Sequence, residues 1–143
     1  IMIVPEIDVP GHASALLTAY PELGSKVVDL NVGTNEKAQK FTQFQSYAIE
    51  RNAGIFNPTL DPSNPKTYQF LSEIFDEVCP LFSGNYFHIG GDENEGKDWD
   101  SNPKIQDFKK KNKLETNHDL QTYFTMQLIP MLKKHLYILL VLD

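Results

Sequence analysis

The chain has 143 residues, of which 41% are hydrophobic and 22% charged, and its formal net charge is −6. This length is typical of about one domain, and this composition argues against a disordered chain. The acidic balance argues against a nucleic-acid-binding protein, because such proteins usually carry a basic patch. The run Lys109-Lys110-Lys111, which has Asp107 and Glu115 close by, is instead typical of a solvated helix face.

The first part of the chain predicts a strand and a helix, followed by a long irregular connection. The near-continuous apolar run from Ile1 to Ile7 fits a strand that is buried on both faces. After a turn at Pro10-Gly11, a helix is predicted from the spacing of Ala13, Leu16, Leu17 and Tyr20. Residues 24 to 63 show little periodicity apart from a short helix near Glu36 to Tyr47, and a connection of this length is often functional.

The rest of the chain alternates predicted helices and strands. Asn64-Pro65 marks a helix start, because a capping residue precedes proline at the first helical position. The later elements are a strand over Asn85 to Ile89, a short helix over Pro103 to Asn112, a longer helix over Asn117 to Lys134 with a kink at Pro130, and a third strand over Leu136 to Leu142. The order β-α-β-α-β predicts an α/β fold with parallel strands and right-handed helical crossovers.

The single cysteine, Cys79, excludes a disulfide within the chain and a zinc site built on cysteines. Its neighbours Phe75, Val78 and Leu81 favour a buried small hydrophobic residue over a nucleophile. The thiol is therefore not a candidate catalytic group.

Both ends of the sequence interrupt runs that are typical of strands. Ile1-Met2-Ile3-Val4 begins without the basic leader and apolar run of a signal peptide. At the other end, the apolar run from Leu136 to Leu142 is too short to span a membrane and is closed by Asp143. We therefore expect both ends to be cuts through a larger fold, so that these residues do not reveal the localisation of the parent protein.

The hexapeptide His88-Ile89-Gly90-Gly91-Asp92-Glu93, at the end of the second predicted strand, is the most informative stretch of the chain. Glycine has no Cβ, so another part of the backbone or a ligand can approach closely there. Adjacent strand residues point to opposite faces, so Asp92 and Glu93 can serve one ligand only if the chain leaves the strand at about Gly91. The carboxyl end of a strand is where α/β enzymes place their chemistry.

Polar residues also follow the first predicted strand, where Glu6, Asp8 and His12 lie. Because parallel neighbours end at the same rim, we expect these residues to lie near Asp92 and Glu93. Two neighbouring carboxylates resist ionising together, which raises the pKa of one of them and suits it to act as a general acid near neutral pH. His12 could orient or tune that acid, since imidazole titrates in the same range.

Less specific interpretations of the same residues are open at this point. Asp92-Glu93 could be a solvated turn that caps the next helix, and Asp8 could be either a partner of His12 or a turn residue. His88 is interpreted as a hydrogen-bonded core histidine. Three further acids are interpreted as exposed: Glu95, Asp98 and Asp100.

Two other functional classes fit parts of the pattern. A metal-dependent hydrolase is one of them, because five side chains offer oxygen or nitrogen ligands: Asp8, His12, His88, Asp92 and Glu93. Against it, neither histidine has an i, i+4 partner of the usual zinc type. A carbohydrate-binding relic without turnover is the second.

A glycosidase needs a proton donor for the leaving oxygen and a group that stabilises an oxocarbenium-like state. Asp92 and Glu93 can supply both, but consecutive side chains approach from one side, whereas ordinary retaining enzymes place two carboxyls about 5–5.5 Å apart across the bond. The nucleophile would therefore come from elsewhere, such as the substrate itself.

Two segments resemble the signature strand ends of family 20 glycoside hydrolases, the β-N-acetylhexosaminidases: Pro5-Glu6-Ile7-Asp8-Val9-Pro10-Gly11-His12-Ala13 and His88-Ile89-Gly90-Gly91-Asp92-Glu93. The stretch from Leu60 to Tyr68 is also similar to that family, and the resemblance runs from residue 1 to about residue 134. It implies an α/β fold of the TIM (β/α)8 barrel type. Residues 1–143 would be a fragment of one catalytic barrel domain, holding about the third to fifth strands with their helices.

The resemblance also implies a mechanism. Glu93 would protonate the glycosidic oxygen and later act as base, Asp92 would hold and stabilise the 2-acetamido group, and His12 would support the acid. The acetamido oxygen would attack the anomeric carbon with net retention, which is the substrate-assisted route. The implied substrate is a glycan with a terminal N-acetylhexosamine (GlcNAc or GalNAc), without metal, cofactor or nucleic acid, and the implied location is periplasmic, secreted or lysosomal.

The chain also departs from the family pattern. The family's sugar-binding arginine lies upstream, and the tryptophans and tyrosine of its acetamido pocket lie on later strands. Trp99, in the loop after the acidic pair, could line an outer subsite. The run from Leu136 to Asp143 lacks the family's Trp-Asp-Glu-like ending, so Asp143 is given no role. We therefore expect these 143 residues alone to be inactive.

Overall fold

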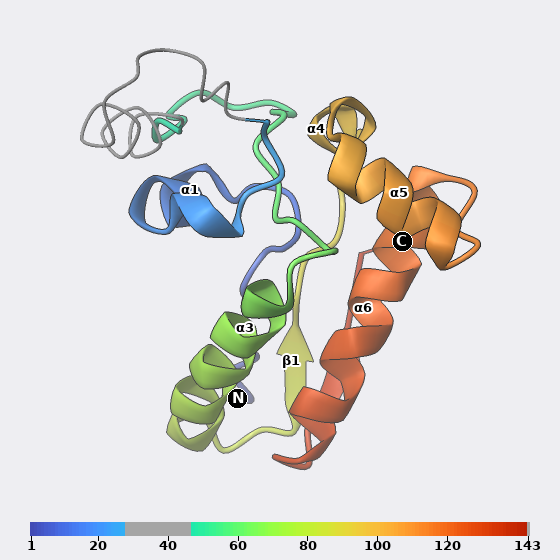
Figure 1. The fold of residues 1–143 in the computed structure, drawn as a ribbon. Helices are drawn as coiled ribbons and strands as arrows, with labels where there is room; N and C mark the ends of the chain where they lie inside the picture. Colours follow the sequence, from blue (N-terminus) through green and yellow to red (C-terminus); the bar gives the residue numbers. More distant parts are fainter. Residues whose placement is uncertain (28–46, 143) are drawn as a thin grey trace.

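The structure is a computed structural model that describes residues 1–27 and 47–142 (Figure 1). Its helices are α1 (Ser14–Ala19), α3 (Pro65–Val78), α4 (Lys97–Ser101), α5 (Pro103–Lys111) and α6 (Asn117–Lys133), and its strands are β1 (Tyr86–His88) and β2 (Ile138–Leu140). The helix predicted near Glu36 to Tyr47 falls outside the described residues, except for Tyr47 itself. In the part of the chain that is described, no helix combines the length and the apolarity needed to cross a bilayer.

The described strands run parallel, with β1 in the centre. β1 pairs in parallel with β2. On its other side, the N-terminal segment forms a parallel bridge between Glu6 and His88, and the N–H of Val9 donates to the carbonyl of Ile89 at 2.8 Å. The predicted parallel topology is therefore confirmed.

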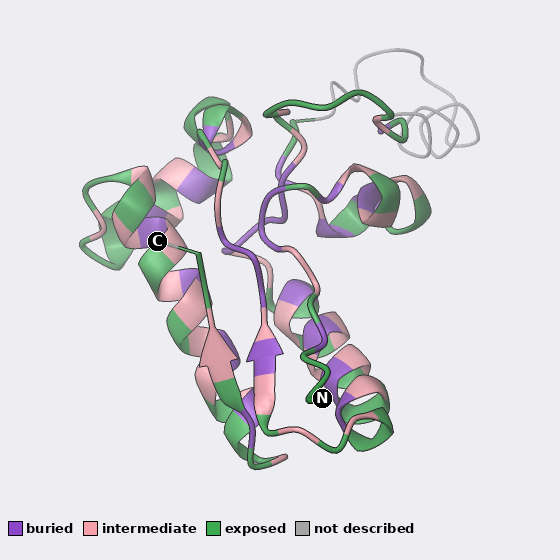
Figure 2. Ribbon diagram, turned by 180° about the vertical axis from the view of Figure 1, so that it is seen from behind, coloured by how far each residue is buried: buried purple, intermediate pink, exposed green. Residues whose placement is uncertain are grey.

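The predicted strand from Ile1 to Ile7, buried on both faces, is wrong in extent. The side chains of residues 1–4 are exposed, that of Ile3 to 65%, and the chain near the N-terminus is green in Figure 2. Pro5 has no N–H to contribute to a ladder, so strand pairing begins only around Glu6.

Helices α3 and α6 pack against each other and cover one face of the strands (Figures 1 and 2). Their buried residues recur at helical spacing: Leu71 and Phe75 on α3, and Leu120, Phe124, Leu128 and Leu132 on α6. Phe87, at the centre of β1, is fully buried, and its ring meets that of Phe75 edge-on with centroids 4.9 Å apart. Full burial of one such side chain contributes about 1.5–3 kcal/mol, so this layer is the main source of stability.

The helices predicted in the second half of the chain are confirmed, and their caps explain where they begin. Asn64 accepts an N–H from Lys66 at 3.1 Å, and Asn102 has the same role at α5. Thr116 opens α6 in a capping box with Asp119. Helix α4 was not predicted, because a helix of five residues is too short to show an apolar stripe.

A second, smaller core joins α4, α5 and α6: Trp99, Ile105 and Leu120. Trp99 is fully buried, and its indole N–H donates to the carbonyl of Leu60 at 2.9 Å. The prediction that Trp99 lines an outer subsite is therefore wrong, because the large ring forms the centre of this cluster.

The run of three lysines on α5 is not uniformly solvated. Lys110 lies beside Asp107 at 3.8 Å and both side chains are exposed, as predicted. Lys109 is buried instead, and its Nζ donates to the Oδ1 of Asn117 at 2.8 Å. The prediction is wrong for Lys109, because α6 packs over that side of α5 and supplies a polar partner.

Cys79 is buried, as predicted. Burial raises the pKa of its thiol, and the nearby negative charge of Asp76 adds to that effect. A thiol with a raised pKa is a poor nucleophile, so Cys79 has a packing role.

Candidate active site

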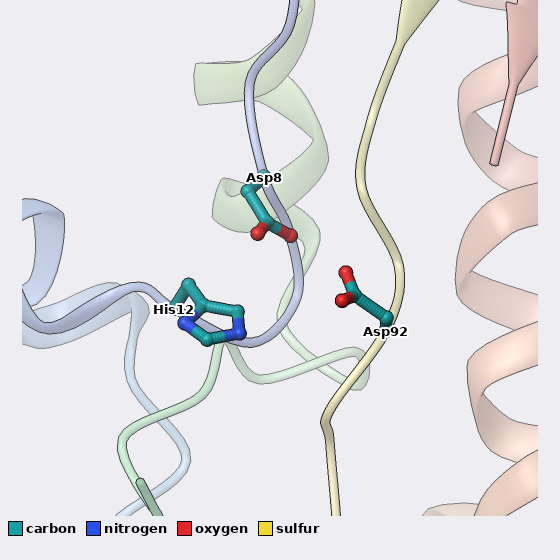
Figure 3. A group of neighbouring side chains, drawn as sticks. All are labelled: Asp8, His12 and Asp92. Carbon is teal, nitrogen blue, oxygen red and sulfur yellow. The ribbon is translucent and has the colours of Figure 1, made fainter. Parts of the chain in front are cut away.

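The first side of the site is a turn that follows the N-terminal segment. The carbonyl of Pro10 accepts two hydrogen bonds from the far end of the long connection, one from Thr59 Oγ1 at 2.9 Å and one from Leu60 N at 3.0 Å. His12 then adopts a φ of 48°, which is uncommon for a residue other than glycine. The turn aims its ring toward the end of the neighbouring strand (Figure 3).

The second side is the loop that follows β1, in which three residues up to Glu93 are left-handed: Gly90 with φ 65°, Gly91 with φ 91° and Glu93 with φ 52°. A Cβ on Gly90 would overlap the carboxylate of Asp8, so only glycine fits at this position. The chain has therefore left the strand before it reaches Asp92, as the sequence predicted.

Four of the five polar residues predicted at this rim come together there, whereas the fifth, Glu6, contacts His88. The Nε2 of His12 lies 3.3 Å from the Oε2 of Glu93. Ligand atoms of Asp8, His12 and Asp92 all lie within 4.8 Å of one another, and their side chains point toward each other in Figure 3. The N–H of Gly91 donates to the Oδ1 of Asp8 at 3.4 Å and links the two segments directly.

Asp8 is the acid whose pKa is raised at this rim. Burial is the largest cause, and the negative charges of Asp92 and Glu6 act in the same direction. The N–H of Gly91 and the charge of His12 oppose the rise. Asp8 therefore favours its protonated form more than a solvated aspartate does.

Asp92 carries the most unusual polar atom of the site. Its Oδ1 is buried and has no hydrogen-bond partner among the described residues. A buried acceptor without a partner is costly, and such groups concentrate at functional sites. The atom is suited to receive an N–H from a bound molecule.

His88 lies apart from this group, on β1. Its Nδ1 accepts the N–H of Gly90 at 3.0 Å and lies 3.4 Å from the Oε2 of Glu6. A ring nitrogen that accepts a hydrogen bond carries no proton to donate, so the contact with Glu6 is not a second hydrogen bond in that tautomer. The arrangement matches the predicted hydrogen-bonded core histidine rather than a ligand of the Asp8 group.

Three of the five predicted metal ligands come together: Asp8, His12 and Asp92. Two carboxylates and one imidazole suit a borderline divalent cation such as zinc or manganese. The same groups equally suit acid–base chemistry, with Glu93 beside the imidazole.

A cavity of about 250 Å³ adjoins His12 and Glu93. Its other wall comes from the end of the long connection: Glu50, Asn52, Gly54, Phe56 and Pro58. The N–H of Glu50 donates to the Oγ of Ser14 at 3.1 Å and ties this wall to α1. The end of the long connection thus adjoins His12 and Glu93, and its functional role stays a prediction.

Gln121, on α6, is a site residue that the sequence analysis did not find. Its Nε2 donates to the carbonyl of Gly91, and its Oε1 accepts the Nδ2 of Asn94 at 3.2 Å. A glutamine on a helix face carries no local signal of such a role, because the contact spans about thirty residues of sequence.

The three acids predicted to be exposed behave differently. Glu95 and Asp100 are exposed, and they contact Lys97 and Asn117 respectively. Asp98 is half-buried, and burial raises the pKa of its carboxyl against the lowering effect of Lys26. The prediction is therefore wrong for Asp98, which lines a cavity with Lys26.

Comparison with known proteins gives the same family that the two motifs suggest. The model of the glycosyl hydrolase family 20 catalytic domain matches residues 1–141. A β-hexosaminidase of Porphyromonas gingivalis is 34% identical over 135 residues, which cover 94% of this chain and 15% of that protein.

Two solved structures support the match at the level of the fold. A chitobiase of Flavobacterium johnsoniae has 70% sequence identity and a TM-score of 0.84, over 99% of this chain and 19% of that one. An exo-β-N-acetylglucosaminidase of Vibrio harveyi, solved in complex with N-acetylglucosamine, has 27% identity and a TM-score of 0.71. The match covers 99% of this chain and 20% of that one. The chain thus spans a fifth or less of the length of each of these relatives. It belongs to the catalytic domain of glycosyl hydrolase family 20, a family of TIM barrels.

Proposed function

We propose that the protein containing this chain is a β-N-acetylhexosaminidase that releases terminal N-acetylhexosamine from glycans with retention of configuration. One observation carries the proposal: the consecutive acids Asp92 and Glu93 both face His12 at one rim, with Glu93 Oε2 3.3 Å from His12 Nε2. The matching relatives are named for this chemistry, as chitobiase, β-hexosaminidase and exo-β-N-acetylglucosaminidase.

Glu93 is the general acid of this proposal. Its side chain is 48% exposed, so its carboxyl can reach the leaving oxygen of a bound glycoside. It donates a proton to that oxygen as the bond to the anomeric carbon breaks, and it later takes a proton from the water that attacks. His12 steadies the carboxyl from behind.

Asp92 is the partner of the acetamido group. Its buried Oδ1 lacks a protein partner, and the acetamido N–H of the substrate would supply one. The acetamido oxygen then attacks the anomeric carbon, and the carboxylate of Asp92 stabilises the positive charge that develops on the nitrogen. A route of this kind needs no opposed protein carboxylate.

We also propose that residues 1–143 form about the third to fifth strands of the barrel with their helices. Parallel order, with helices over one face only, is the arrangement of a barrel wall. In β1 the buried Phe87 faces the helices, whereas Tyr86 and His88 lie half-buried on the other face, as barrel-lining residues would. Such a piece presents one side of a sugar site, so we expect no turnover from the isolated chain.

Glu93→Gln in the full-length protein tests the proposal. The glutamine cannot donate an acidic proton, so hydrolysis of a chromogenic N-acetylglucosaminide should fall by about 10²–10⁴-fold. Glu95→Gln is the matched control, because Glu95 is exposed and pairs with Lys97 outside the rim. Equal rates for the two variants would remove Glu93 from the mechanism.

The metal-dependent hydrolase stays as a second candidate, because Asp8, His12 and Asp92 converge. A chelator separates the two: the hexosaminidase should keep its rate, whereas a metal enzyme should lose it and regain it on addition of zinc or manganese. A protein that binds the glycan without any turnover would indicate the carbohydrate-binding alternative.

A further inference from the structure

A chain of three hydrogen bonds spans the acidic loop after β1. The N–H of Gly96 donates to the Oδ1 of Asn94 at 3.0 Å, the Nδ2 of Asn94 donates to the Oε1 of Gln121 at 3.2 Å, and the Nε2 of Gln121 donates to the carbonyl of Gly91. The chain begins and ends on backbone groups on either side of Asp92 and Glu93.

The direction of this chain is determined by its ends. A backbone carbonyl only accepts and a backbone N–H only donates, so each amide in between has one possible orientation. The glutamine must present nitrogen to Gly91 and oxygen to Asn94. Both halves of its amide are therefore used, and near neutral pH no other side chain of this length supplies both a donor and an acceptor in this way.

The loop that Gln121 holds is under conformational strain. Glu93 has a φ of 52° and follows two glycines with positive φ, and this left-handed conformation is unfavourable for a residue other than glycine. Two further hydrogen bonds hold the loop before the acids: Leu142 N–H donates to Gly90 O at 2.8 Å, and Gly91 N–H donates to Asp8 Oδ1 at 3.4 Å. Gln121 holds the Gly91 carbonyl, which directly precedes the two acids.

The helix that carries Gln121, α6, is held in place by its buried side chains. Leu120 and Phe124, its neighbours on α6, are fully buried in the two cores. Side chains mounted on packed helices hold a site more precisely than loop residues do.

We propose that Gln121 is a positioning residue, which holds the strained loop so that Asp92 and Glu93 act on one substrate. The proposal rests on the function proposed above and adds a residue outside the two signature motifs. Gln121 touches no reacting atom. It acts through the Gly91–Asp92 peptide, whose carbonyl it binds.

The main test is Gln121→Met in the full-length protein, with Gln127→Met as control. Methionine keeps the length of the side chain and the helix but removes both hydrogen bonds. Gln127 lies on the same helix, is also half-buried, and its side chain has no hydrogen bond among the described residues. A misplacement of about 1 Å in a catalytic group costs about 10²-fold, so kcat of Gln121→Met should fall by up to that factor, with a smaller change in KM.

Leaving-group dependence shows whether the proton donor is displaced. The loss should be larger for a phenyl N-acetylglucosaminide, whose departure needs the proton of Glu93, than for a 2,4-dinitrophenyl one. An equal loss with both substrates would overturn the positioning of Glu93.

Gln121→Glu gives a readout that a merely structural role would not give. Ionised glutamate cannot donate to the Gly91 carbonyl, whereas protonated glutamic acid can donate there and still accept from Asn94. The kcat of this variant, relative to wild type, should therefore recover as the pH falls, and that of Gln121→Met should not.

The outcomes separate this inference from the proposed function. If wild type is active and Glu93→Gln is not, but Gln121→Met matches Gln127→Met, only the positioning role is overturned. If wild type does not hydrolyse N-acetylglucosaminides, the proposed function fails and the inference falls with it. If Gln121→Met unfolds, the pH-dependent recovery of Gln121→Glu still decides the question.

Discussion

The acidic rim and the layer of helices differ in their local energetics: the layer buries apolar side chains, whereas the rim contains strained backbone and a polar atom that pairs with no described residue. In the layer between α3, α6 and β1, Phe75, Phe87 and Phe124 are fully buried in one hydrophobic cluster. At the rim, His12 and Glu93 take left-handed backbone conformations, and a buried oxygen of Asp92 has no partner among the described residues.

The difference shows that, within residues 1–27 and 47–142, conformational strain and unpaired polar atoms are found at the rim, and not in the apolar layer that supports it. Strain and unpaired polar atoms persist only where the surrounding structure holds them in place. Here the apolar layer supplies that support, and the rim uses it to aim consecutive acids at one point. Substitutions in the apolar layer should therefore lower stability, whereas substitutions at the rim should lower the catalytic rate.

The largest loss of stability is expected from Phe87→Ala in the full-length protein. Removing a fully buried ring between Phe75 and Tyr137 leaves a cavity and should lower the free energy of unfolding by about 3–5 kcal/mol. Urea denaturation measures the change. The control is Leu81→Ala, because the Leu81 side chain is 76% exposed and its removal should change stability by less than about 0.5 kcal/mol. Similar values for both variants would contradict the assignment of the core.

Asp92→Asn should show the opposite signature. Loss of the carboxylate that faces the acetamido group should lower kcat by about 10²–10³-fold, as removal of one stabilising group in a transition state does. The melting temperature should not fall, because the buried Oδ1 has no partner to lose among the described residues. Steady-state kinetics and thermal melting on the same preparations check both halves. An unchanged rate would remove Asp92 from the mechanism, and a large fall in melting temperature would show that the rim itself supports the fold.

Asp8→Asn should give the smallest effect, a change in the pH dependence of the melting temperature. The direction of this change follows from the raised pKa of Asp8. An acid whose pKa is higher in the folded state binds its proton more tightly there, so the stability that it contributes is present at low pH. That stability is lost as the pH rises above the ordinary value of 3.8 and through the raised one. Asparagine does not titrate. The melting temperature of wild type relative to Asp8→Asn should therefore fall as the pH rises above about 4. A difference that does not vary with pH, or that grows in the other direction, would contradict the raised pKa.

Several parts of the molecule could be predicted because their cause is local. Asn64, Asn102 and Thr116 cap helices with their own side chains, close to where each helix begins. Other parts could not be predicted, because their cause lies elsewhere in the chain. Lys109 is buried under α6, and Trp99 is held by a carbonyl about forty residues away.

The sequence by itself determined the longer helices, the parallel order of the strands and the two polar segments, since spacing, capping and turn residues act between near neighbours. Only the tertiary structure decided that Glu6 lies beside His88, that Trp99 is buried, and that Gln121 reaches the acidic loop. Those relations depend on backbone directions and contacts between segments far apart in the chain, which residue patterns do not contain.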